Sequence, residues 1–144
     1  MAYISYEELK INLSERLIIQ LTDDNKLGQP DMAKVDQAIA KAMAEVDGYC
    51  VVKYPDKVPF KDPVPEVVKT AVFDITIYRL FCLKENMPEN RLTQYKSAVA
   101  TLRDIAGGRV GLGIPTADIP APNQDSILSH VPERIFSSDS LSDY

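Results

Sequence analysis

Ten prolines decide where helices can form in this chain of 144 residues. Proline has no backbone N–H and its ring clashes with the preceding helical turn, so a long helix must lie between prolines or begin at one. Four stretches before residue 109 meet this condition, and their apolar residues recur every three or four positions, as on the buried face of a helix. Beyond residue 109 the prolines exclude a long helix; these are Pro115, Pro120, Pro122 and Pro132.

The first stretch carries a helix start signal. Ser5 and Glu8 have the spacing of a capping box, in which a hydroxyl and a carboxylate each accept a hydrogen bond from a free backbone N–H. A helix is therefore predicted to begin near Tyr6. Residues 14–15, Ser-Glu, allow it to restart after a break, and the helical signal ends at residues 22–24.

The other three stretches have start and stop signals of their own. Asp31 can cap the second helix, and Pro65 suits the first turn of the third. The fourth is predicted from about Glu89 to Ala106, where two glycines supply the stop. The apolar stripes are Val35, Ile39, Met43, Val46 and Cys50, then Val68, Ala71, Val72, Ile75, Tyr78 and Cys82, and then Leu92, Tyr95, Val99, Leu102 and Ala106.

Four helices with short connections predict an all-α fold, a small helical bundle of about four helices over residues 1–108. Pro55, Pro59 and Pro63 predict a rigid, non-helical connection between the second and third helices. Gly48 within the second stretch indicates either a closely approaching backbone or the beginning of the helix end, because glycine weakens a helix interior.

Residues 109–144 are predicted to form an extended acidic C-terminal arm. This stretch contains two arginines and five acidic residues, and its apolar residues are too few for a separate core. Ile135, Phe136 and Leu141 nevertheless stand in this polar stretch, where exposed apolar surface costs roughly 25 cal/mol per Å². We predict that they are interface anchors, covered by the chain's own core, by another copy or by a different partner.

Charge and hydropathy exclude two broad classes of protein. The formal net charge is -5 and no cluster of Lys or Arg occurs, so the general attraction to phosphate backbones is missing. Lys69, Asp74 and Arg79 interrupt the longest apolar segment, which argues against a membrane span. The first ten residues lack the features of a secretory signal, so we expect the chain to stay in the cytoplasm where it is made.

The sequence offers little material for catalysis. The sole histidine, His130, stands in the arm without a neighbouring Cys or second His, so neither a zinc site nor a rigid hydrolase triad is expected. The glycines of residues 107–113 lack the Lys-Ser/Thr pair of a phosphate loop. We expect no enzyme activity, no cofactor and no metal site.

One loop, residues 23–34, partly follows the pattern of a calcium-binding loop. Asp23, Asn25 and Gly28 fall at the first, third and sixth positions, but Leu27 and Lys34 occupy ligand positions. An ordinary polar turn that caps the second helix is the preferred interpretation, with weak divalent-cation binding as the alternative.

The remaining charged residues and the cysteines have structural interpretations. Asp74 and Arg79 are expected to form an exposed or interface charge pair. A solvated face of the fourth helix is expected for three basic residues, namely Arg91, Lys96 and Arg103. Cys50 and Cys82 are expected to be buried thiols, with a disulfide as the alternative.

A series of short motifs, in order along nearly the whole chain, is similar to a known family. The motifs are "AYISYEELK", "LIIQLTDD", "AIAKAMAEVDGYC", "KYP", "VFDITIYRLF", "LRDIAGGRVGLG" and "RIFSSDSL". Together they resemble the small head-to-tail joining (connector or adaptor) proteins of Mu-like bacteriophages and prophages.

The resemblance implies a structural virion protein at the head–tail junction, assembled in the cytoplasm of the bacterial host. It implies a ring homo-oligomer, dodecameric when assembled, that lies below the portal protein and offers a surface to a tail-completion protein. DNA would be only the genome passing through the channel, and no membrane is involved. The alternative, from the residues alone, is a monomeric helical binding or regulatory protein whose arm folds on its own core.

Overall fold

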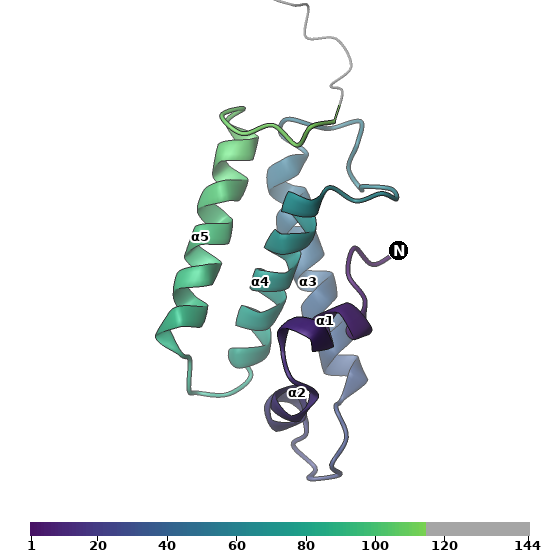
Figure 1. Ribbon diagram of the computed structural model, residues 1–144, viewed down its shortest axis with the longest axis vertical. Coiled ribbons are helices and arrows are strands. Elements are labelled where there is room, and N and C mark those ends of the chain that lie inside the picture. Colours follow the sequence, from purple (N-terminus) through teal and green to yellow (C-terminus); the bar gives the residue numbers. More distant parts are fainter. Residues whose placement is uncertain (115–144) are drawn as a thin grey trace, which may run out of the picture.

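The computed structural model describes residues 1–114 and is helical with no strand over this range (Figure 1). Its five helices are α1 (Tyr6–Asn12), α2 (Glu15–Thr22), α3 (Met32–Cys50), α4 (Glu66–Phe81) and α5 (Glu89–Ala106). The prediction of an all-α fold is confirmed for these residues. The first predicted helix is in fact two short helices, separated at Leu13 and Ser14.

The three long helices stand side by side, and the two short ones lie beside α3 and α4 (Figure 1). α4 is central, because it packs against α3, α5 and α2, while α3 also contacts α5. No helix within residues 1–114 is long and apolar enough to span a membrane.

Helix ends follow the predicted capping signals closely. The Glu8 N–H donates to Ser5 Oγ at 3.2 Å and the Ser5 N–H donates to Glu8 Oε2 at 2.7 Å, which completes the capping box of α1. Asp31 caps α3 by accepting from the Ala33 N–H at 3.1 Å. After α5, Gly108 has a φ of 74°, in the left-handed region where glycine is favoured.

The predicted stripes of α3 and α4 are mostly buried, whereas on α5 Val99 and Leu102 are buried and the other three predicted residues, Leu92, Tyr95 and Ala106, are only partly buried. Ala98 and Ile105 are the other buried residues of α5. Because α4 lies between two long helices, it is buried on more than one face, and Ile77, Leu80 and Phe81 join the core beside the predicted residues. Tyr78 is only partly buried.

The prediction that both cysteines are buried is wrong for Cys82. α4 ends at Phe81, so Cys82 follows the last helical residue and its side chain is exposed. Cys50 is fully buried, and both thiols are free. A Cβ added at Gly48 would meet nothing within 4 Å, so no backbone approaches it closely, and α3 ends two residues later at Cys50.

The non-helical segments also contribute to the core. Tyr54, Phe60 and Val64 of the proline-rich connection are buried. The first residues of the predicted arm lie against the bundle, where Leu112 and Ile114 pack partly buried on the core. The Leu112 N–H donates to the Tyr54 hydroxyl at 3.1 Å, which joins the two segments at one end of the bundle.

Candidate interaction surfaces

The three predicted anchors, Ile135, Phe136 and Leu141, lie outside the described residues, as does His130. The surface that could receive such side chains can be sought on residues 1–114. One hollow there is a groove between the N-terminal segment and α3.

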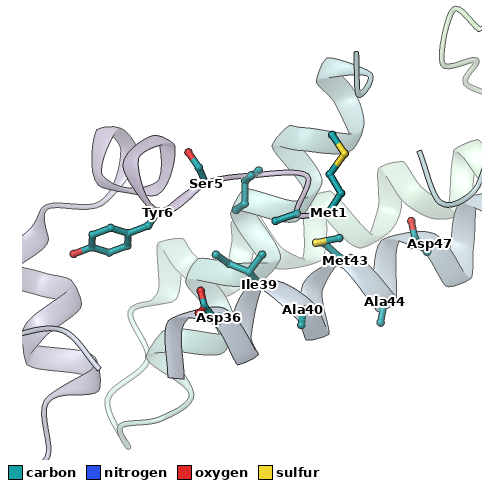
Figure 2. A pocket seen from close by; sticks show the side chains of 11 residues that line it. Met1, Ser5, Tyr6, Asp36, Ile39, Ala40, Met43, Ala44 and Asp47 are labelled. Atoms are coloured by element: carbon teal, nitrogen blue, oxygen red, sulfur yellow. The ribbon is translucent and has the colours of Figure 1, made fainter. Parts of the chain in front are cut away.

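This groove has a volume of about 550 Å³ (Figure 2). Most of its lining is apolar, and two carboxylates lie along α3 eleven positions apart, a rise of about 16 Å. Ile39 and Met43 point from α3 toward the N-terminal segment in Figure 2. The lining residues are Met1, Ala2, Ile4, Ser5, Tyr6, Asp36, Ile39, Ala40, Met43, Ala44 and Asp47.

The groove exists because α3 presents small side chains where no other helix of residues 1–114 covers it. Ala40 and Ala44 stand one turn apart on α3 and both are exposed. The N-terminal segment crosses this helix beside them, and the Tyr3 N–H lies 3.5 Å from Met43 Sδ. An apolar side chain entering the groove would contact Met43 and the two alanines and lose its water shell.

Two hydrogen bonds of the Tyr3 hydroxyl hold the N-terminal wall of the groove in place. The Tyr3 hydroxyl donates to Asp47 Oδ1 at 2.6 Å and accepts from the Phe60 N–H at 2.9 Å. The rings of Tyr3 and Phe60 pack edge to face, with their centroids 6.0 Å apart. Burial raises the pKa of Tyr3 and also that of Asp47, although the Tyr3 hydrogen bond opposes the rise at Asp47. The N-terminal segment is thus tied to α3 and to the proline-rich connection through one side chain.

The loop of residues 23–34 is the polar turn that its sequence predicted. Asp23 accepts hydrogen bonds from the N–H groups of Leu27 (3.0 Å) and Gly28 (2.8 Å). Asp24 pairs with Lys34 and, at 2.6 Å, with Lys84. These two ammonium groups, Lys34 first, lower the pKa of Asp24 to about 2. The carboxylates of this turn therefore bind backbone N–H groups and lysines, and residues 1–114 contain no cluster of three candidate metal ligands.

The expected pairing of Asp74 with Arg79 is wrong. Arg79 instead binds Glu45 of α3 at 2.6 Å, and the Tyr95 hydroxyl donates to the same carboxylate at 2.9 Å. Residues five apart lie on different sides of a helix that repeats every 3.6 residues, so Asp74 faces elsewhere. It lies half-buried in a hollow of about 290 Å³ between α4 and α5.

On α5, the expectation of a solvated basic face is confirmed for Lys96 and Arg103, which are exposed. Arg91 is partly buried and lies over the Phe81 ring, 5.9 Å from its centroid. This face therefore carries one residue that packs on the core beside two that point into solvent.

Comparison with known proteins bears on the identity of the chain. Residues 3–130 match the model of the family described as "Bacteriophage Mu, Gp36". The chain belongs to this family. Among relatives, the protein named "Gene product J" of Escherichia phage Mu is 28% identical over 102 residues, which cover 70% of this chain and 68% of that protein.

Membership in the Mu Gp36 family confirms the resemblance of the sequence motifs to a Mu-like phage protein. The matched range ends at residue 130, before the three predicted anchors of the arm. Sequence reasoning predicted these anchors but missed the groove. The available signal was the pair Ala40 and Ala44, small residues that directly follow Ile39 and Met43 of the apolar stripe.

Proposed function

We propose that this protein is a head–tail connector subunit, which forms a ring below the portal and joins the DNA-filled capsid to the tail. The observation that carries the proposal is the match of residues 3–130 to a family of bacteriophage Mu proteins. The motifs that first indicated the connector role lie mostly within this range.

The architecture suits a ring subunit. A compact helical bundle can serve as the body of each subunit, and a C-terminal arm can reach a neighbour, the portal or the tail-completion protein. Contacts between two different surfaces of identical subunits close into a ring when the rotation permits. Ile135, Phe136 and Leu141 are the proposed anchors of such contacts.

The charge of the chain also supports this role. With a net charge of -5, the subunit repels phosphate groups, so a genome passing through the ring would not adhere to it. The proposed site of action is the head–tail junction of the virion. The role requires neither catalysis nor a cofactor.

The test combines the purified subunit with the purified portal and examines the mixture by electron microscopy. We expect weak, concentration-dependent self-association of the subunit alone and rings, dodecameric as the family resemblance implies, when the portal is present. Monomers under every condition, with and without portal, would contradict the proposal.

The second candidate function is a monomeric binding or regulatory protein whose arm folds on its own core. The groove beside α3 favours this candidate to the extent that it can hold an arm. Size measurement over a concentration series separates the two, because a monomeric protein keeps one mass at every concentration and with portal added.

A further inference from the structure

We infer that the groove between the N-terminal segment and α3 binds residues 134–136 (Arg134, Ile135 and Phe136) of the same chain in the free subunit. The inference concerns the subunit before any assembly. It goes beyond the proposed connector role and does not depend on it.

The apolar lining of the groove suits the apolar side chains of Ile135 and Phe136. Ala40, Met43 and Ala44 offer an apolar surface from α3, and Met1 and Ala2 offer one from the N-terminal segment. Ile135 and Phe136 are adjacent in sequence, so both can enter one hollow of this size. Docking would remove from water the surface of two side chains that a polar tail leaves exposed.

Charge complementarity selects this part of the arm. Arg134 is the sole Lys or Arg of residues 115–144, and it directly precedes the apolar pair. Asp36 lies on the lining of the groove, is exposed, and makes no ion pair with any other residue of the described range. Asp47 is already bonded to the Tyr3 hydroxyl. Asp36 is therefore the partner that we assign to Arg134.

The length of the arm permits docking within one chain. Nineteen residues lie between Ile114 and Arg134, and a fully extended chain of that length spans at most about 70 Å. Helix α3, with 19 residues, is about 28 Å long. Leu112, near the end of the described chain, is bonded to Tyr54, which lies four residues after the end of α3, so the remaining arm begins near the same helix that lines the groove.

A tethered ligand also has an advantage over one from another molecule. A short linker holds its ligand at an effective concentration in the mM range, far above that of a second copy in dilute solution. The free subunit should consequently cover its own anchors, which would keep them from binding wrong partners.

The first experiment measures disulfide formation in the full chain with Cys82→Ser, so that Cys50, which is buried, is the only native thiol left. Ala40→Cys places a thiol in the groove and Ser137→Cys places one directly after Phe136. The matched control is Ala100→Cys with Ser137→Cys, because Ala100 is also exposed but lies on α5. In dilute protein, with oxidised glutathione added as the electron acceptor, we expect the groove pair to close an intramolecular disulfide about tenfold faster than the control pair.

The second experiment exchanges the charges within the same groove cysteine pair. We expect Arg134→Asp to slow disulfide formation, and Asp36→Arg combined with Arg134→Asp to restore it. Asp56→Arg combined with Arg134→Asp is the control that should not restore it, because Asp56 is exposed and outside the groove. Phe136→Ala, added to the same cysteine pair, should also slow the reaction, because it removes an apolar side chain that is inferred to enter the groove.

Three results would overturn the inference. One is an equal rate for the groove and control pairs, and another is failure of the exchanged charges to restore the reaction. The third is a disulfide that links two chains and accelerates with concentration, which would assign the groove to the arm of a second copy. Rings formed with the portal by a subunit that fails these tests would refute the docking and leave the connector role intact.

Discussion

Asp74 is a carboxylate held half-buried between α4 and α5, and its charge is disfavoured there. Burial raises its pKa, and the attraction of Arg91 only partly opposes this rise. The folded protein therefore prefers the neutral acid more than the unfolded chain does, whose Asp pKa is about 3.9. The stability gained from this preference is present below that value and is lost as the pH rises through the raised pKa of the folded state.

We accordingly predict that Asp74→Asn raises the melting temperature at pH 7, and that the gain disappears as the pH falls to about 3. Thermal unfolding followed by circular dichroism over a pH series measures both effects. Asp24→Asn is the matched control, for which we expect the opposite change in melting temperature at pH 7. Its ion pairs lower the pKa to about 2, so that variant should lose stability at pH 7 and approach the wild type near pH 2. A lower melting temperature of Asp74→Asn at pH 7 would contradict the prediction.

At the scale of elements, residues 109–114 belong physically to the bundle. Leu112 and Ile114 are partly buried against the core, and the Leu112 N–H is bonded to the Tyr54 hydroxyl. Arg109 also pairs with Asp104 of α5, at 2.8 Å from Nε to Oδ1. This short segment therefore fastens the end of α5 to the connection that follows α3.

A chain that ends at Gly108 should thus be less stable than one that ends at Ile114, by roughly 1 to 3 kcal/mol, because it loses two partly buried side chains and a hydrogen bond. Denaturant unfolding of the two truncated chains gives this difference. Their helical circular dichroism signals per molecule should be equal, since residues 109–114 contain no helix. Equal midpoints would show that the segment contributes nothing to the bundle.

The elements also show which parts of the fold a sequence can predict. Ser5, Asp31 and Gly108 act through hydrogen bonds or backbone angles a few residues away, so their helix ends could be predicted closely. The burial of Ile77 and the pairing of Arg79 with Glu45 depend on which helix lies opposite α4, which no local pattern specifies. The groove likewise depends on where the N-terminal segment crosses α3.

At the scale of the whole molecule, the bundle and the arm are expected to have separable roles. We predict that a chain ending at Ile114 keeps the helical signal of the full chain but no longer forms rings with the portal. Circular dichroism measures the first property and electron microscopy the second. The double variant Ile135→Ala, Phe136→Ala should behave like the truncated chain, because it removes the proposed anchors and keeps the length of the arm.

The opposite outcome has a clear meaning. If the truncated chain formed rings as readily as the full chain, the anchors of the arm would be dispensable for assembly. The body of the ring would then be made by surfaces of residues 1–114 alone.

Only one of the two cysteines of this chain is expected to react with a fluorescent label. Cys50 is fully buried, and burial raises the pKa of its thiol to about 11, so almost no reactive thiolate forms at neutral pH. Cys82 is exposed at the end of α4. A maleimide dye should therefore attach once per subunit without any engineered residue. Counting the photobleaching steps of a single labelled particle would then give the number of subunits in any ring that the protein forms.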